Sequence, residues 1–143
     1  MYEPVVTIFG NVVDQPRHLQ TTTGAMTKFR VACTPRVKRD GEWVDGDTSF
    51  FDVTCWNRLA DHVAGSVAKG EPVLVHGRLT MREWVTENNR GRSAEIIADR
   101  VGHDLLRGTS MFRKPGQPVP SAQRAEPEFA PAEAPEAEDT AAA

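Results

Sequence analysis

Apolar and polar side chains alternate along five segments of this chain, and an alternation of period two is typical of a β-strand with one buried face. The five segments are residues 5–13, 28–34, 49–56, 72–84 and 93–101. The first segment, VVTIFGNVV, contains a central glycine at Gly10, which predicts a bend or a β-bulge there. We therefore expect a fold built mainly from strands.

The third and fourth segments divide their side chains between an apolar face and an aromatic, cationic face. In residues 49–56 the apolar face holds Phe51, Val53 and Cys55. Phe50 and Trp56 fall on the opposite face, although a shift of one residue in register would exchange Phe50 and Phe51. In residues 72–84 the two faces hold Val73, Val75, Leu79 and Met81 on one side and His76, Arg78, Thr80, Arg82 and Trp84 on the other.

A short helix is predicted between the third and fourth strands. Leu59, Val63 and Val67 recur at i, i+4 and i+8, which places them on one helical face. Asn57 precedes them as a candidate N-cap, and Lys69-Gly70 supplies a cation and a glycine where a helix C-terminus favours them. We expect the helix to end at this pair.

Turn signals separate the strands and define the order of elements. Thr23-Gly24 precedes the second strand, and NNRGR at 88–92 is the predicted tip of a hairpin. Residues 36–49 contain two Asp-Gly pairs and predict an extended hairpin loop with a basic root formed by Arg36, Lys38 and Arg39. Three strands, a helix and two strands, with a bent first strand, match the five-stranded OB barrel, which binds oligonucleotides or oligosaccharides. The predicted class is therefore all-β with one short helix.

Charge is distributed unevenly along the chain. Residues 1–114 hold 16 Lys and Arg against 14 Asp and Glu, whereas residues 115–143 hold one Arg and six acids. The net charges are therefore +2 and −5, and +2 is too small for a protein that coats duplex DNA. The acidic stretch has only two large apolar residues, Val119 and Phe129, too few to offset the entropy of ordering. We predict an OB domain at residues 1–112 and a disordered Ala/Pro/Glu-rich tail at 113–143.

Several function classes find no support in the residues. Cys33 and Cys55 lie in strand patterns without CxxC or Cys/His spacing, so we expect reduced thiols and no metal site, with a disulfide as the alternative. The four His are scattered and GxxxxGK[ST], GxSxG and HExxH are absent, so no cofactor and no catalysis are predicted. No segment approaches the ~20 apolar residues of a membrane span, and MYEPVVTIFG does not resemble a signal peptide. We expect a cytoplasmic protein.

Aromatic rings interleaved with cations indicate a surface for single-stranded nucleic acid, because rings stack on bases while Lys and Arg contact phosphates. The predicted stacking residues, on the face opposite the apolar one, are Phe50, Trp56 and Trp84. The predicted phosphate contacts are Arg30, Arg36, Lys38, Arg78 and Arg82. Trp43 lies between the two Asp-Gly turns, where packing of its own loop explains it as well as stacking does. Four further cations are left without an assigned contact: Lys28, Arg58, Arg90 and Arg92.

Long segments of the chain, in the same order, resemble the bacterial single-stranded DNA-binding protein (SSB) family over about residues 3–112. These segments are FGNVVDQP, KFRVACTPR, GEWVDGDTSFFDVTCWNRLADHVAGSVAKG and VLVHGRLTMREW. The spacing TPR…GEW.DG…F and the segment GHDLLRGT resemble the actinobacterial branch, and within it a secondary paralogue more than a housekeeping member.

The resemblance implies stacking at the same three aromatic positions and assembly into a homotetramer. It also implies that GHDLLRGTSMF adds a further strand between subunits. Two features depart from the family pattern. A further stacking aromatic near the end of the second strand is replaced by Pro35-Arg36-Val37, and the chain ends EAEDTAAA without a terminal Pro-Phe. We therefore predict no recruitment of repair proteins through the usual tail motif.

The predicted function is sequence-tolerant binding and protection of single-stranded DNA in replication, recombination, repair or chromosome segregation, on the nucleoid. Two alternatives stay open. The same face could serve an RNA-binding OB module, which matched DNA and RNA oligonucleotides would distinguish. An OB-fold protein-interaction subunit with weak nucleic-acid binding is the other, and the missing aromatic favours it.

Overall fold

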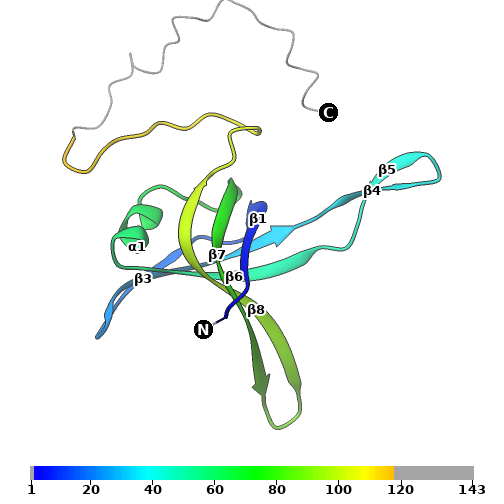
Figure 1. The fold of residues 1–143 in the computed structure, drawn as a ribbon, viewed down its shortest axis with the longest axis horizontal. Helices are drawn as coiled ribbons and strands as arrows, with labels where there is room; N and C mark the ends of the chain where they lie inside the picture. Colours follow the sequence, from blue (N-terminus) through cyan, green and yellow to red (C-terminus); the bar gives the residue numbers. More distant parts are fainter. Residues whose placement is uncertain (1, 118–143) are drawn as a thin grey trace, which may run out of the picture. The chain divides into compact units, whose positions relative to one another are not determined.

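The computed structural model describes residues 2–117, and the chain divides into two units, residues 1–104 and 105–143. Within residues 2–117, every strand and the helix belong to the first unit. In chain order these are β1 (Val5–Val12), β2 (Arg17–Thr21), β3 (Gly24–Cys33), β4 (Arg36–Arg39), β5 (Glu42–Asp45), β6 (Ser49–Trp56), α1 (Asn57–Ala64), β7 (Pro72–Val85) and β8 (Arg90–His103). Figure 1 shows α1 at one end of the curved sheet formed by the longer strands.

Six strands form one sheet in the order β1-β7-β8-β6-β3-β2, and a further pairing of β1 with β3 closes it. β6 and β8 run parallel, whereas the other pairs in this sheet are antiparallel. The closed ring therefore consists of β1, β3, β6, β8 and β7, with α1 between β6 and β7 in the chain. This arrangement is the predicted five-stranded OB barrel, and the fold class is confirmed.

Gly10 lies where β1 passes from β7 to β3. It pairs with Val73, and the next residue, Asn11, is opposite both Pro72 and Ala32. A Cβ at Gly10 would collide with the carbonyl oxygen of Ala32 and lie 2.7 Å from Cγ1 of Val31. The glycine thus allows the backbones to approach closely enough to close the barrel.

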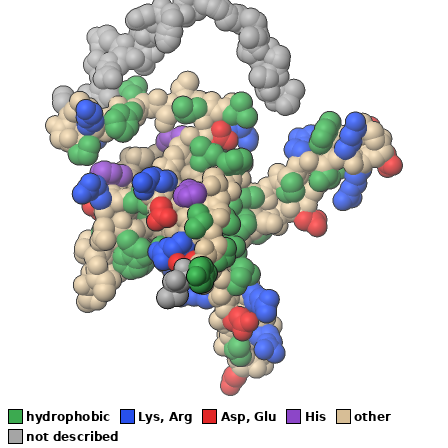
Figure 2. Space-filling model, in the orientation of Figure 1, with side chains coloured by type: hydrophobic (Ala, Val, Ile, Leu, Met, Phe, Trp, Pro, Cys, Tyr) green, Lys and Arg blue, Asp and Glu red, His purple; other side chains and the backbone are tan. Residues whose placement is uncertain are grey.

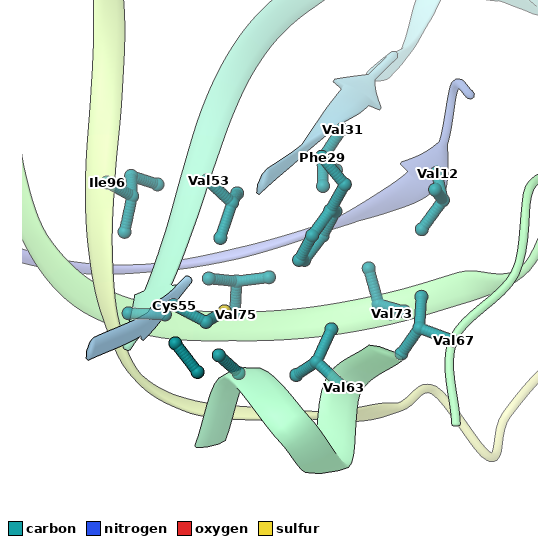
Figure 3. Packing of buried hydrophobic residues seen from close by; sticks show 13 residues of the cluster. Val12, Phe29, Val31, Val53, Cys55, Val63, Val67, Val73, Val75 and Ile96 are labelled. Atoms are coloured by element: carbon teal, nitrogen blue, oxygen red, sulfur yellow. The ribbon is translucent and has the colours of Figure 1, made fainter. Parts of the chain in front are cut away.

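The core fills the barrel with β-branched side chains and one large ring. Val53, Val73 and Val75 are fully buried, which confirms the predicted inward phase of these residues, and Val31 and Ile96 are fully buried as well. Phe29 and the α1 residue Val63 point into the same interior (Figure 3). Phe51 packs against this cluster whereas Phe50 is about half exposed, so the register places Phe50 on the outside.

A hydrogen-bonded threonine joins the helix to the sheet. Thr27 on β3 is fully buried, and its Oγ1 donates to the carbonyl oxygen of Ala60 at 2.8 Å. Oγ1 of Thr27 also lies 2.8 Å from Nδ1 of His18 on β2. Buried polar groups need such partners because an unpaired one costs free energy.

The predicted boundaries of the helix are wrong at both ends. Asn57 is not an N-cap: it has φ 57°, and Trp56 caps the helix without a side-chain hydrogen bond. Asn tolerates the left-handed region, so β6 turns into α1 within one residue. The helix ends at Ala64 and not at Lys69-Gly70. Gly70 instead has φ 87° and donates its N–H to Val12 O, which holds the following loop against β1.

Two hairpins project from the barrel (Figure 1). The first is the arm β4–β5, which turns at Asp40-Gly41 and confirms the predicted extended hairpin loop. The second is the outer part of β7–β8, here called the tip and comprising residues 81–93. Met81 was predicted to be in the core but is 54% exposed, because β7 extends past the barrel and leaves nothing beneath this side chain.

Sequence patterns missed β2 and underestimated the length of β3 and β8. β2 pairs with β3 from Arg17 opposite Lys28 to Thr21 opposite Gly24. Its residues RHLQT have no alternation of apolar and polar side chains, because four of the five are exposed at the edge of the sheet. Its strand conformation comes from the backbone pairing with β3.

Both cysteines are free thiols, so the predicted reduced state agrees with the structure and the disulfide alternative does not. Cys33 is opposite Ser49 and Cys55 is opposite Thr27, at the two ends of the β3–β6 ladder. Burial raises the pKa of Cys55 to about 12 and also raises that of Cys33. Each thiol is therefore protonated near neutral pH.

Residues 105–117 of the second unit form no helix or strand, only turns and irregular backbone. Gln117 closes a local turn, since its N–H donates to Lys114 O and its side-chain oxygen accepts from Lys114 N. Most of the predicted disordered tail, residues 118–143, lies outside the described residues, and the domain boundary after residue 112 stays a prediction. Within residues 2–117, no helix is long and apolar enough to cross a membrane.

The carboxylate of Glu71 contacts His103 at the end of β8, and we expect it to make the stability of the fold depend on pH. Glu71 Oε1 lies 2.9 Å from Nε2 of His103 and accepts the N–H of Ala68 at 2.9 Å. The hydrogen bond from His103, with that from Ala68, lowers the pKa of Glu71. A lowered folded-state pKa adds stability above the ordinary carboxyl pKa, and this is lost as pH falls through the lowered value. We expect Glu71→Gln to be less stable than wild type at pH 6 and to lose less stability between about pH 5 and pH 3.

Urea unfolding at a series of pH values measures this effect. Glu87→Gln in the exposed turn of the tip is the matched control and should follow the wild type. Identical pH profiles for Glu71→Gln and wild type would contradict the assigned role of Glu71.

Candidate nucleic-acid interface

Outward side chains of four neighbouring strands fall into register across the sheet. Arg30 on β3 is opposite Asp52 on β6, and Asp52 is opposite Glu95 on β8. Glu95 is in turn opposite Thr80 on β7, and Arg82 follows two residues later on the same side. Residues distant in the chain thus form one continuous face, which we call the outer face.

A groove of about 570 Å³ lies in the outer face. Four cations and three carboxylates line it, so its charge is mixed and only slightly positive. The charged lining residues are Arg17, Lys28, Arg30, Arg82, Asp14, Asp52 and Glu95, and the others are Gln15, Phe29, Val53 and Ser93.

Arg30 is held between a carboxylate and an aromatic ring. Its Nε lies 3.0 Å from Oδ1 of Asp52, and its guanidinium carbon lies 5.7 Å from the centre of the Phe50 ring. An arginine over a ring face gains a cation–π attraction. The two contacts fix the guanidinium beside the groove while leaving it about half exposed.

Glu95 organises the opposite wall of the groove. Its Oε2 accepts from the Thr54 hydroxyl at 3.1 Å, and its Oε1 lies 3.8 Å from Nη1 of Arg82. The Glu95 side chain is 14% exposed, whereas that of Arg82 is 61% exposed. The carboxylate is therefore fixed by its neighbours, and the arginine keeps most of its donors in solvent.

The three predicted stacking rings all lie on the outer face. Phe50 is 51% exposed and Trp84 is 46% exposed, while Trp56 is half-buried opposite Met26. Phe50 and Trp56 are six residues apart on β6, which is about 20 Å along the strand. Trp84 is on the tip, beyond Arg82. The rings are thus spread along the outer face and not stacked on one another.

The predicted phosphate-binding cations lie in three places, which are the groove, the arm and, for Arg78 alone, the part of β7 that pairs with β1. Arg30 and Arg82 line the groove. Arg36 and Lys38 are on the arm, where Arg36 Nη2 donates to Trp43 O at 3.3 Å. Figure 2 shows Lys and Arg side chains along both projecting hairpins, mixed with acidic ones.

Arg78 is the predicted cation that the structure separates from the groove. Its Nη1 lies 3.5 Å from Oε1 of Glu3, and it is opposite Val5 of β1. β7 pairs with β1 at this point, and Arg78 contacts Glu3 instead of lining the groove.

Trp43 lies on the arm as an exposed ring. It is 61% exposed, and Lys38 Nζ lies 6.0 Å from its ring centre. Arg36 also pairs with Asp45 at 3.6 Å across the arm. These contacts support the packing of the loop on itself, although the ring remains open to solvent.

Two cations that line the groove, Arg17 and Lys28, were not predicted as phosphate contacts. Arg17 is on the unpredicted strand β2, and Lys28, directly opposite it on β3, had no assigned contact. The alternation of Lys28 with Phe29 signals its outward direction, but no local pattern signals Arg17. Within residues 2–117, no group of three or more His, Cys, Asp or Glu could hold a metal ion.

A closed OB barrel whose outer face presents rings and cations around an open groove belongs to the class of oligonucleotide-binding modules. Residues 4–104 match the model of the single-strand binding protein family. This chain therefore belongs to that family, and the predicted resemblance is confirmed.

Relatives in Streptomyces extend the similarity over nearly the whole chain. Single-stranded DNA-binding protein 2 of Streptomyces avermitilis is 42% identical over 138 residues, covering 95% of this chain and 84% of the relative. Single-stranded DNA-binding protein 1 of Streptomyces coelicolor is 38% identical over 130 residues, covering 90% and 83%. These relatives support the predicted place among secondary actinobacterial members.

Solved structures show the same fold. The crystal structure of the small single-stranded DNA-binding protein from Streptomyces coelicolor has a TM-score of 0.72 and 41% identity, covering 76% of this chain and 100% of that one. The second single-stranded DNA-binding protein (SSBb) from Mycobacterium smegmatis has a TM-score of 0.62 and 31% identity, covering 79% and 100%.

Proposed function

We propose that this protein binds single-stranded DNA without strong sequence preference, with bases stacked on the rings of the outer face and phosphates held by neighbouring cations. The stacking residues are Phe50, Trp56 and Trp84. The phosphate contacts are Arg30 and Arg82 in the groove and Arg36 and Lys38 on the arm, and the groove adds Arg17 and Lys28. Arg78, which does not line the groove, is left out of the proposed path. The observation that carries the proposal is the outer face, where the Phe50 ring contacts the groove residue Arg30 and Trp84 follows the groove residue Arg82 by two positions on β7.

Stacking favours single strands over duplexes because paired bases cannot present their faces to a ring. Each base stacked on an aromatic side chain contributes about 1–3 kcal/mol and tolerates any base. The distance of about 20 Å between Phe50 and Trp56 is long enough for several nucleotides, in keeping with the ~4–16 nucleotides that OB folds cover. Family membership agrees with the prediction that the chain is a binding protein and not an enzyme.

Titration of the full chain with oligo(dT), followed by intrinsic tryptophan fluorescence, tests the proposal. We expect strong quenching by the single strand, little response to a matched duplex, and weaker affinity as salt rises because bound cations release counterions. Tighter binding of a matched RNA oligonucleotide would favour an RNA-binding module. No response to any oligonucleotide would overturn the proposal and favour a protein-interaction subunit.

The carboxylates of the groove lower the affinity for phosphates in this scheme. Oδ1 of Asp52 forms an ion pair with Nε of Arg30 at 3.0 Å, so this arginine is less available to a phosphate. Asp52 also adds a negative charge to a groove of small net charge. We expect Asp52→Asn to bind oligo(dT) about 2- to 5-fold more tightly at low salt. This change in affinity corresponds to the free energy that an exposed ion pair usually contributes. The gain should shrink as salt screens the groove.

Fluorescence anisotropy of a labelled oligonucleotide measures this change. Asp99→Asn, on β8 outside the groove, is the matched control and should leave affinity unchanged. Weaker binding by Asp52→Asn would show instead that holding Arg30 in place outweighs charge.

The family resemblance and exposed apolar side chains support a homotetramer. On β1, Val5 is 56% exposed and Phe9 is 62% exposed, facing away from the core. In residues 105–117, Met111 and Phe112 are 52% and 77% exposed, which fits the proposal that residues 102–112 add a strand between subunits.

Analytical ultracentrifugation tests this assembly. We expect a tetramer for the wild type and smaller species for Phe9→Asp, since a buried charge opposes association. Phe9→Ala is the graded comparison, with a smaller effect because it removes the ring without placing a charge in the interface. A wild-type monomer would overturn the proposed assembly.

Coating of single strands would protect them during replication, recombination, repair or chromosome segregation, and would place the protein in the cytoplasm on the nucleoid. These roles follow from the proposed binding.

A further inference from the structure

Trp84 lies flat against a glycine on the neighbouring strand of the tip. Trp84 is opposite Gly91 in the β7–β8 ladder. A Cβ at Gly91 would lie 2.7 Å from Cε2 and 2.9 Å from Cη2 of Trp84, and would collide with Cζ2. All three atoms belong to the six-membered ring of the indole, so this ring covers the bare backbone of Gly91.

The Trp84 side chain is on the tip and is 46% exposed. The tip extends past the barrel, with Met81 54% exposed and Val85 71% exposed. An aromatic side chain in such a position is mobile unless it packs on its own hairpin. A glycine opposite an aromatic in a strand pair provides this packing surface, because the ring can lie directly on the backbone.

We propose that Gly91 is a positioning residue for Trp84, which holds the indole with one face on the backbone and the other face open to a base. The inference rests on the proposed stacking function of Trp84. Because the ring is ordered before DNA arrives, binding loses less side-chain freedom. A methyl group at position 91 lifts the ring and removes this preorganisation.

The backbone conformation at position 91 does not require a glycine. It is absent from the glycines with positive φ, which are Gly24, Gly41, Gly70 and Gly116, so alanine fits its backbone conformation. The three nearest obstacles to a Cβ are all atoms of Trp84. The strand therefore tolerates alanine at this position, provided that the indole moves.

A double-mutant cycle tests the inference, with binding of a labelled oligo(dT) followed by anisotropy. We expect Gly91→Ala to weaken binding about 3- to 10-fold, the range for ordering one large side chain. In the Trp84→Ala background the same substitution should change affinity less than about 1.5-fold, since no ring remains to be positioned. Gly65→Ala, after α1 and outside the groove, is the control and should be neutral, because its φ of −91° suits alanine and an added Cβ would make only ordinary contacts at 3.8 and 3.9 Å.

Near-UV circular dichroism of the free protein provides a readout independent of DNA. The band lost in Trp84→Ala reports the fixed orientation of that ring, and Gly91→Ala should lose the same band. An unchanged band, or an equal loss of affinity from Gly91→Ala in both backgrounds, would overturn the inference. If Trp84→Ala itself left affinity unchanged, stacking on Trp84 would be wrong. If Trp84→Ala weakened binding and Gly91→Ala did not, only the positioning role would be wrong.

Discussion

Replacing Trp56 and Trp84 together with alanine is expected to weaken binding to oligo(dT) by about 30-fold or more. Each ring contributes ~1–3 kcal/mol of stacking, and two lost platforms add to at least ~2 kcal/mol, because the rings lie apart on different strands. The salt dependence of binding should change little, since no cation is removed. Anisotropy titrations at several salt concentrations measure both quantities.

The control for this variant is Met81→Ala with Val85→Ala. These residues are on β7 like Trp84 and are exposed, but they project from the opposite face of the strand. Their loss should leave affinity unchanged. If the double tryptophan variant kept wild-type affinity while remaining folded, the stacking mechanism would be wrong.

Replacing Phe29 with alanine is expected to lower the free energy of unfolding by ~3–5 kcal/mol, the usual cost of removing a buried Phe ring. Phe29 is 4% exposed and is the largest side chain of the buried cluster, on the strand that closes the barrel against β1. The cavity left in a core of β-branched residues cannot collapse easily, since these side chains have few alternative rotamers. Urea denaturation at one fixed protein concentration measures the change, because the stability of an oligomer depends on concentration.

Phe50→Ala is the matched comparison, since Phe50 is on the neighbouring strand β6 but faces outward and is 51% exposed. We expect a stability change within about 0.5 kcal/mol, as for most surface positions, together with weaker DNA binding. Phe29→Ala should lose stability with little change in DNA affinity at temperatures where it remains folded, because its ring is buried in the core although the residue borders the groove. Equal losses of stability from the two variants would contradict the assigned faces of β3 and β6.

The rings could be found from the sequence because alternation along a strand is a local property. Val53 and Cys55 are apolar and buried, so Phe50 and Trp56 had to face outward once the register was right. Alternation does not predict burial where a strand leaves the barrel. Met81 has the correct phase but no core beneath it, and only the extent of the barrel decides that.

The helix boundaries show another limit of local patterns. Asn57 has the residue type of an N-cap, yet it takes a left-handed conformation because β6 must turn at once into α1. Lys69-Gly70 has the signature of a helix end, but Gly70 serves the loop that bonds to Val12. In both cases the neighbouring strands, which the local sequence does not describe, set the backbone.

The OB class, the inward and outward phases of β6 and β7, and the outward strand phase of Phe50, Trp56 and Trp84 could be predicted from the chain alone, because these patterns depend on residues close together in the sequence. Only the tertiary structure decided which charges share the groove. The β2–β3 pairing brings in Arg17, the parallel β6–β8 pairing places Glu95 beside Asp52, and closure of the barrel separates Arg78 from the groove. These pairings join residues distant in the chain. They cannot be read locally because nearly every residue offers the same backbone N–H and C=O groups, so the sequence of one strand does not identify the strand beside it.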